Sequence, residues 1–468
     1  MPLLDNSACR QLALRALATM THHGGESIRV KIARTSSATL VRLIEEHPND
    51  AKVAELATVT LAHSVSAVVN VGEPAPDPKV FQALDVPAII RVLTENVRKP
   101  TASLYLLEHA VNSLPGFTLH CRKDCQAYPS MLRLLVATLR SSDMARRCTA
   151  LEGLIRLHKL EAEKDQRIFD SIQAVARLQR DLPSHLSDVM TAYGPPRCET
   201  VLTLKTAALF QRAMMTCAQD HNLYALGLTL SQLILRTEFS ISDGMFQAEN
   251  PTTGQLEFVD VGLPFRTWSD ALPHCARAIR DKGNPTEIDA ADILDLKFFV
   301  MKQRLREAVE FAKKATQRNS DLAYFCYIVT LTADNAEGLR YAKKGMKCKN
   351  TTPFVHFQMM QRAVEHAAQM GLSTLQDSSS VRDRKWEEGI AFLTSAMEDS
   401  KTYIEQAPPD NRYMKNVSYW RILLTLALHG PELNVDLREL DVSFDILQWM
   451  PLSDMRNTSG CSQEAQGC

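Results

Sequence analysis

The chain has 468 residues, with 53 Lys and Arg against 54 Asp and Glu, so its formal net charge is −1. This balance excludes a whole-chain electrostatic attraction to nucleic acid or to an anionic membrane. Apolar residues make up 45% of the chain, too many for a wholly disordered protein and enough for large cores. Only 18 Gly and 21 Pro interrupt a sequence rich in Leu, Ala, Arg and Glu, which is typical of helices.

The sequence contains no segment that we expect to act as a signal peptide or to cross a membrane. Asp5 and Arg10 interrupt the apolar core that a signal peptide needs. The longest apolar stretch, residues 51–71, carries Lys52 and Glu55, and its polar positions recur at helical spacing, so it predicts a buried helix. The eleven cysteines have no disulfide-framework spacing. We therefore expect reduced thiols and a cytoplasmic or nuclear location, with no membrane partner.

Helical periodicity dominates the first half of the chain. Asp50 is placed to cap the helix that follows it, and the proline-rich residues 72–78 predict a loop. Very short turns such as 141–143 require neighbouring antiparallel helices, and a string of such pairs is an α-solenoid that resembles armadillo or HEAT repeats. The other helices are expected near 5–21, 79–97, 101–113, 124–140, 142–158, 164–181, 197–218 and 220–236.

The pattern changes over residues 240–266. A Pro-Thr-Thr-Gly turn lies between two short apolar runs, which predicts a β-hairpin or an ordered loop at the boundary of two helical halves. Helices then resume, and residues 371–381 are expected to form a loop. The predicted domains are 1–236 (armadillo/HEAT-like), 237–266 (hairpin or loop), 267–450 (helical) and 451–468 (disordered tail). The later helices are expected near 267–282, 286–300, 302–318, 321–333, 335–348, 353–370, 382–405, 411–429 and 433–448.

One internal repeat stands out in the second half. Residues 306–315 (REAVEFAKKA) align with residues 336–345 (AEGLRYAKKG) at an offset of 30, with matching acidic, small, aromatic, Ala, Lys and Lys positions. This pattern resembles the tetratricopeptide repeat over about 300–370, although the family period is about 34 residues. On this resemblance the predicted domain 267–450 is tetratricopeptide-like. A chance match in an unrelated helical bundle is the alternative. If the repeat is real, Ala312 and Ala342 occupy equivalent close-packed sites.

A second resemblance rests on His47 to Ser64 followed by a second helical half and cysteines at the extreme C-terminus. This layout is similar to large fungal proteins that carry a MYND zinc finger after a helical scaffold. Such a finger needs a full set of Cys and His ligands, whereas this sequence offers only Cys461 and Cys468, so the finger itself is missing. The resemblance implies protein–protein contact.

Sequence alone gives no convincing metal or catalytic site. Cys121 and Cys125 with His120 have ligand chemistry but no second half-site, so we interpret them as packing cysteines. Residues 22–26 (HHGGE) could form a metal-binding or phosphate-binding loop, but no strand precedes them, so we interpret them as a helix end and turn. Cys461 and Cys468 alone cannot complete a zinc site. The phosphate-loop, dinucleotide, zinc-protease and nucleophile-elbow motifs do not occur, and we therefore expect no enzyme activity, no cofactor and no stoichiometric zinc.

Residues 297–349 are locally basic, with 12 Lys and Arg against 5 Asp and Glu. In stacked repeats, the pairs Lys313–Lys314 and Lys343–Lys344 would recur on corresponding helices. They could form a positive ridge for RNA or an acidic peptide, or simply belong to solvated outer faces. A single continuous ridge would favour RNA, and scattered charges would favour a protein partner.

Together these features predict an all-α superhelix, a helical-repeat solenoid, with a small hairpin or ordered loop near 240–266. The expected function is a non-enzymatic scaffold or adaptor that binds a protein or peptide partner through a concave groove. The alternatives are an RNA-binding helical-repeat protein that uses residues 297–349, or the scaffold part of a MYND-type zinc-binding protein.

Overall fold

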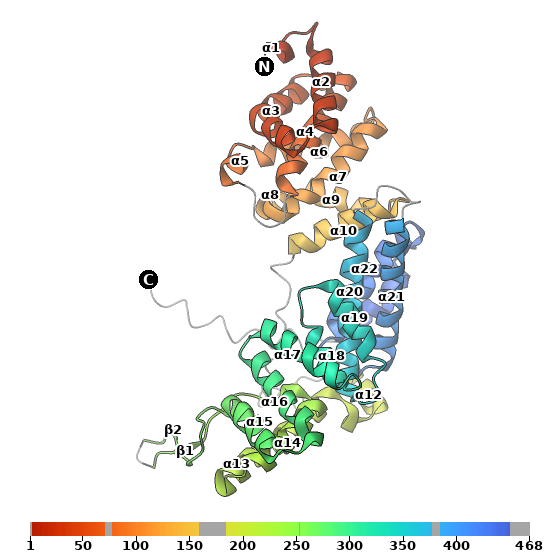
Figure 1. Cartoon of the computed structure of the whole chain (residues 1–468). Helices are drawn as coiled ribbons and strands as arrows, with labels where there is room; N and C mark the ends of the chain where they lie inside the picture. Colours follow the sequence, from red (N-terminus) through yellow and green to blue (C-terminus); the bar gives the residue numbers. More distant parts are fainter. Residues whose placement is uncertain (1, 71–76, 159–183, 252, 377–383, 450–468) are drawn as a thin grey trace. The chain divides into compact units, whose positions relative to one another are not determined.

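The protein is almost entirely helical (Figure 1). A computed structural model describes residues 2–70, 77–158, 184–251, 253–376 and 384–449. Within these ranges 77% of residues are helical, and the strands form one two-stranded sheet. The predicted all-α class and the small hairpin are therefore confirmed. Six single-turn 3₁₀ helices accompany the longer elements in the described ranges (Pro195–Arg197, Glu238–Ser240, Trp268–Asp270, Pro285–Glu287, Gly430–Glu432 and Arg438–Leu440).

The chain forms two compact units. Unit 1 comprises residues 1–163, 372–389 and 426–433, and unit 2 comprises residues 164–371, 390–425 and 434–468. The hairpin near 250 lies within unit 2 and does not separate the two units. The two units therefore differ from the domains expected from the sequence, 1–236 and 267–450, because residues 372–389 and 426–433 belong to the unit that contains the N-terminus. Three long helices have residues in both units (α20, Pro353–Gln376; α21, Arg384–Gln406; α22, Met414–His429).

In unit 1 the core is built around the apolar helix α4, which α2, α3 and α7 contact. Among the described helices, α4 is the one whose length and composition would suffice to cross a membrane, and 72% of its most apolar window is buried. Such burial is typical of a core helix. Unit 1 contains ten whole helices in the described ranges (α1, Pro2–Asp5; α2, Arg10–His23; α3, Glu26–Glu46; α4, Ala51–Val69; α5, Pro78–Gln82; α6, Val86–Val97; α7, Leu104–His120; α8, Arg122–Gln126; α9, Pro129–Thr138; α10, Met144–His158).

Local capping fixes where several of these helices begin. The Asp50 carboxylate accepts hydrogen bonds from the backbone N–H groups of Lys52 and Val53, both at 3.0 Å, as its position in the sequence predicts. The single helix expected over 79–97 is wrong, because α5 and α6 are separate. The Asp85 carboxylate caps α6 and Pro87 lies in the first turn of α6, so the chain breaks there.

A buried arginine, Arg147, connects the N-terminal helices of unit 1 to residues 426–433 of the same unit. The side chain of Arg147 on α10 is only slightly exposed, and its Nε donates to the carbonyl of Ala427 at 2.9 Å. Another guanidinium nitrogen donates to the carbonyl of Ser141 at 2.6 Å. Gly430 lies against the same side chain, since a Cβ at that position would come within 2.7 Å of Arg147 Cδ. Residues 426–433 are therefore part of the packed core of unit 1.

In unit 2 the helices from α13 to α19 pack in series. Each helix contacts the next one in the chain. In addition, α14 contacts α16, and α16 contacts α18. The whole helices of unit 2 in the described ranges follow (α12, Ser184–Tyr193; α13, Glu199–Asp220; α14, Leu223–Arg236; α15, Ala271–Lys282; α16, Ile288–Met301; α17, Leu305–Arg318; α18, Ala323–Val329; α19, Asn335–Gly345; α23, Asp441–Trp449). The β-hairpin pairs β1 (Gln247–Glu249) with β2 (Leu256–Phe258) antiparallel.

Some predicted boundaries in unit 2 need correction. Helix α20 continues to Gln376, so the loop predicted from Gly371 begins too early; residues 377–383 lie outside the described ranges. The helix expected over 321–333 is shorter, and the one expected over 433–448 begins only at Asp441. The predicted helix at 164–181 and the predicted tail at 451–468 also lie outside the described ranges.

Helices α17 and α19 bury corresponding positions of the sequence repeat. Ala312 and Ala342 are both fully buried, and the positions four residues before and three residues after each of them are buried too. The aromatic residues Phe311 and Tyr341 are half-buried in both copies. The offset of 30 seen in the sequence therefore corresponds to one packing pattern used twice.

Buried charges hold distant parts of unit 2 together. Arg412 donates from Nε to the Glu199 carboxylate at 2.6 Å, and both side chains are less than a tenth exposed. The Asp410 carboxylate accepts from the backbone N–H groups at the start of α13, at 2.9 and 2.8 Å. Glu238 lies 3.7 Å from the Lys297 ammonium and accepts a hydrogen bond from Tyr327 at 2.6 Å. These contacts satisfy polar groups that would be costly to bury alone.

Candidate functional sites

The lysines predicted as partner-binding residues lie on α17 and α19, and two of them are already paired. Lys313 Nζ lies 3.0 Å from Glu310 and 2.8 Å from Glu337. Lys343 Nζ lies 2.5 Å from Asp399 of α21. Lys314 and Lys344 are exposed, and Lys344 lies 5.7 Å from the centre of the Tyr341 ring.

The local excess of positive charge is therefore partly neutralised by acids that lie elsewhere in the sequence. Ion pairs engage seven of the twelve Lys and Arg in residues 297–349. Five of their acidic partners lie outside the segment (Glu238, Asp270, Asp289, Asp292 and Asp399). Counting charges within residues 297–349 misses this neutralisation, because these acidic partners belong to other segments that pack against this one.

The cysteines considered in the sequence fall into two groups. Cys121 and Cys125 are buried, and burial raises the pKa of each thiol to about 12, so both are protonated at neutral pH. A protonated thiol is a poor metal ligand and a poor nucleophile. Cys461 and Cys468 lie outside the described residues, so the structure does not bear on the MYND-type resemblance.

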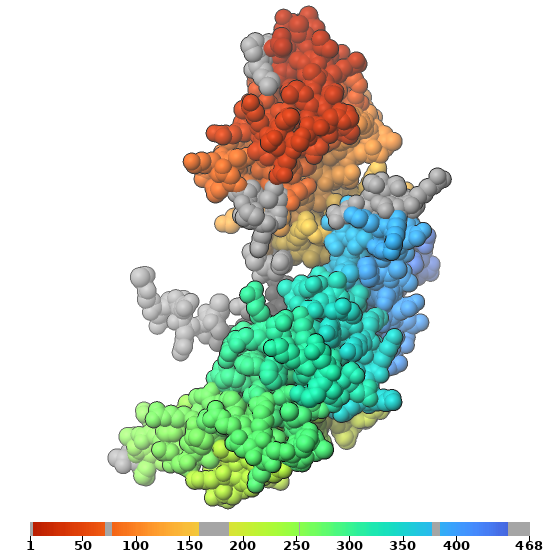
Figure 2. Space-filling view, viewed as in Figure 1, coloured from red at the N-terminus to blue at the C-terminus, as the bar shows by residue number. Residues whose placement is uncertain are grey.

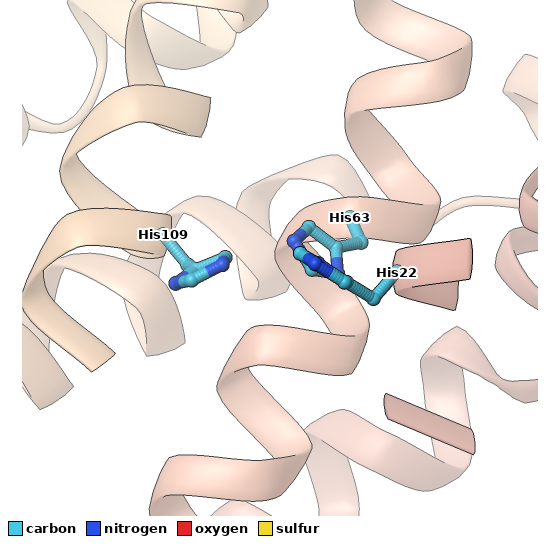
Figure 3. A group of neighbouring side chains, drawn as sticks. All are labelled: His22, His63 and His109. Atoms are coloured by element: carbon cyan, nitrogen blue, oxygen red, sulfur yellow. The ribbon is translucent and has the colours of Figure 1, made fainter. Parts of the chain in front are cut away.

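Three histidines from separate helices meet in unit 1. His22 lies in the last turn of α2, His63 in the middle of α4 and His109 on α7, and their rings point toward one another (Figure 3). One nitrogen from each lies within 4.8 Å of the other two. The ring centres are 5.3 Å apart for His22 and His63, and 4.6 Å apart for His63 and His109. We call this group the histidine cluster.

The position of His63 on α4 explains why the cluster is accessible. Most of α4 is buried, but His63 shares a half-buried stripe with Lys52, Glu55 and Ser66. His109 is half-buried and His22 is exposed, so the cluster opens to solvent on the α2 side. Residues 22–26 do form the predicted helix end and turn, because α2 ends at His23 and α3 begins at Glu26.

Hydrogen bonds orient two of the three rings. The Nδ1–H of His109 donates to the carbonyl of Tyr105 at 2.7 Å. The Thr21 hydroxyl donates to the carbonyl of Ala18 at 3.0 Å, so its oxygen accepts from Nδ1 of His63 at 3.4 Å. These assignments follow from the hydrogen-bond network, and they leave Nε2 of both rings with a lone pair.

The electrostatic surroundings keep the central imidazole neutral. Burial lowers the pKa of His63 to about 4, and His109, His22 and the Arg29 guanidinium add to the effect. Arg29 is held beside the cluster, because its guanidinium donates to the carbonyls of Thr21 at 2.6 Å and His22 at 3.0 Å. A neutral imidazole is the form that binds a metal ion.

No significant match to this chain exists among protein-family models, curated proteins or solved structures. The histidine cluster was missed in the sequence because its members lie on three helices with no motif spacing between them. Two signals were present: His63 is the single histidine of the largely apolar helix α4, and His22 belongs to the HHGGE segment, which its pattern indicates to be a helix end and turn.

Proposed function

We propose that the chain is a non-enzymatic helical-repeat scaffold, in the cytoplasm or nucleus, that binds a protein partner. The observation that carries this proposal is the repeated packing of α17 and α19, in which Ala312 and Ala342 are both fully buried. In repeat proteins each unit reuses one set of packing positions and stacks on its neighbours. Stacked units expose an extended surface, and such surfaces typically bind peptides or helices.

The contacts along unit 2 support the tetratricopeptide-like part of this proposal. Serial contact from α13 to α19, with additional contacts between α14 and α16 and between α16 and α18, is what two layers of antiparallel helices produce. The tetratricopeptide-like assignment of residues 267–450 and the armadillo/HEAT-like assignment of residues 1–236 both belong to the proposal.

The distribution of charge favours a protein partner over RNA. RNA binding relies on unpaired Lys and Arg that can replace counterions along phosphates. Lys313 and Lys343 instead contact Glu337 and Asp399 within unit 2. Releasing them for phosphates would leave these carboxylates without their cationic partners.

The hairpin offers an apolar contact surface in addition to the expected groove. Leu256 and Phe258 lie two residues apart on β2, hence on one face, and are 65% and 41% exposed. The hairpin projects from the helices of unit 2 in Figures 1 and 2. Exposed apolar side chains gathered on one short element are typical of protein contact sites.

The test starts with the tagged full-length chain, from which a partner is identified and then purified. We expect a defined complex whose affinity falls about tenfold or more in Leu256→Ser/Phe258→Ser. Val435→Ser is the matched control, because Val435 is apolar and 97% exposed but lies outside the hairpin. A complex that is unaffected by the hairpin variant would place the contact elsewhere, and failure to obtain any purified complex would contradict the scaffold proposal.

The RNA alternative has its own measurement. Fluorescence anisotropy with a single-stranded RNA would show tight binding that weakens steeply with salt if the basic segment binds phosphates. Lys314→Glu/Lys344→Glu should abolish such binding, because both side chains are exposed. That combined result would favour RNA over a protein partner.

A further inference from the structure

The histidine cluster has the features of a metal-ligand set. His22, His63 and His109 come from α2, α4 and α7, which pack together within unit 1, so the core of that unit positions the three rings. Neutral imidazoles are ligands that suit Zn²⁺, Cu²⁺ and Ni²⁺, whereas Mg²⁺ and Ca²⁺ prefer oxygen ligands. The donor set therefore selects a first-row transition metal.

We propose that His22, His63 and His109 together bind one divalent transition-metal ion, with Zn²⁺ as the ion of reference and water completing the coordination. This site goes beyond the scaffold function and does not depend on it. It also runs against the expectation, drawn from the sequence alone, that the chain binds no stoichiometric zinc.

The geometry requires only a small closure of the rings. Tetrahedral Zn²⁺ with Zn–N distances of about 2.0–2.1 Å places its nitrogen ligands about 3.4 Å apart. The three nitrogens of the cluster lie within 4.8 Å of one another, so the rings must approach by at most about 1.4 Å. His22 is exposed in the last turn of α2 and is the ring with most freedom to make this movement.

The surrounding hydrogen bonds match those of known metal sites. Metal-bound histidines usually donate their second ring N–H to a carbonyl or another oxygen, which fixes the nitrogen that faces the ion. His109 makes such a bond to the Tyr105 carbonyl, and His63 makes one to the Thr21 hydroxyl.

The first experiment measures Zn²⁺ binding to the full-length chain after treatment with a chelator, by isothermal titration calorimetry. We expect one ion per chain in the wild type. His63→Gln and His22→Gln should each weaken Zn²⁺ binding more than roughly 10–100-fold, which is the loss typical when a residue that only hydrogen-bonds to a metal ligand is replaced. His22→Gln is included because His22 is exposed, so its loss leaves the fold intact, which far-ultraviolet circular dichroism verifies.

The matched control is His23→Gln. His23 is exposed and follows His22 on the same helix, but it is not a member of the cluster. We expect His23→Gln to bind Zn²⁺ as the wild type does. Equal losses in His22→Gln and His23→Gln would indicate adventitious binding at surface histidines and would overturn the assignment.

A second variant tests the orientation of the central ring. Thr21→Val removes the oxygen that accepts from His63 Nδ1 and keeps the side-chain shape, so Zn²⁺ affinity should fall about 10–100-fold. Substitution with Co²⁺ gives an independent readout, because its visible absorption reports a four-coordinate ion and should vanish in His63→Gln. No Zn²⁺ binding in the wild type, or unchanged stoichiometry in the triple variant of His22, His63 and His109, would refute the site.

Discussion

The imidazole ring of His366 on α20 fills the space into which a side chain on Gly338 of α19 would project. A Cβ at Gly338 would come within 2.6 Å of Cε1 and 2.7 Å of Cδ2 of that ring. The ring cannot easily move away, because Nε2 donates to the carbonyl of Thr330 at 3.0 Å and Nδ1 lies 2.8 Å from the side-chain amide of Asn335. The small residue at this repeat position therefore permits close approach of the two helices.

Gly338→Ala should consequently destabilise unit 2 even though alanine favours a helix. The added methyl group must displace His366 and break its hydrogen bonds, at a cost of about 1–3 kcal/mol in the free energy of unfolding. Urea denaturation of the full-length chain measures this cost. The double variant Gly338→Ala/His366→Ala should recover part of the loss; equal losses in the single and double variants would show that the ring is not the obstacle.

Ala312→Leu and Ala342→Leu should destabilise the chain alike, because both methyl groups are fully buried at equivalent repeat positions. Overpacking at each site is expected to cost roughly 1–3 kcal/mol. Exposed Lys314 and Lys344 serve as controls, and Leu at either should leave the unfolding midpoint unchanged. Tolerance at one alanine and not the other would mean that the two copies are not equivalent in packing.

Lys313 and Lys343 are unsuitable as controls for those variants. The sequence predicts that both are exposed, whereas their side chains are 26% and 36% exposed and contact Glu337 and Asp399. Their replacement by Leu would remove ion pairs between different helices as well as change surface polarity.

Arg412→Met should be among the most damaging single substitutions. It leaves the Glu199 carboxylate buried without its cation, for which about 3–5 kcal/mol is typical. It also removes the guanidinium that lies 3.2 Å from the centre of the Phe239 ring. In Arg412→Met/Glu199→Met both charges are gone, and thermal unfolding should show much of the stability restored. A double variant as unstable as the single one would contradict this account.

The stability of unit 2 should fall as the pH drops below about 6.5, through His366. Burial lowers the pKa of this histidine from its ordinary 6.5. Below that value the unfolded chain binds a proton that the folded chain still excludes, so stability is lost until the pH reaches the folded-state pKa. Above about pH 6.5, His366 does not change the free energy of unfolding with pH. Urea unfolding across this range should show a shallower pH dependence in His366→Gln, which retains a donor for Thr330; an unchanged slope would assign the effect to other groups.

The sequence predicts what depends on local chemistry. The Asp50 cap, the hairpin near 250 and the equivalence of Ala312 and Ala342 follow from spacing, turn residues and periodicity. The break between α5 and α6 was missed, although Asp85 capping a helix with Pro87 in its first turn is a recognisable start signal.

Side-chain contacts between residues far apart in the sequence could not be predicted from spacing or periodicity. Nothing in the order of residues indicates that His22, His63 and His109 meet, because helix packing alone brings them together. The same holds for Lys343, whose partner Asp399 lies 56 residues away on another helix. Charge counted along the chain therefore overstated the positive surface, and the absence of a metal motif concealed a set of possible ligands.

The contact between Arg147 and the carbonyl of Ala427 has a consequence for biosynthesis. These residues are 280 positions apart, so at about 5–20 residues per second the acceptor leaves the ribosome on the order of 15–60 s after the arginine. Throughout that interval the nascent N-terminal helices carry a cation that cannot be buried with its hydrogen bonds satisfied. Helix α10 can therefore complete its native packing around Arg147 only after residues 426–433 have been synthesised.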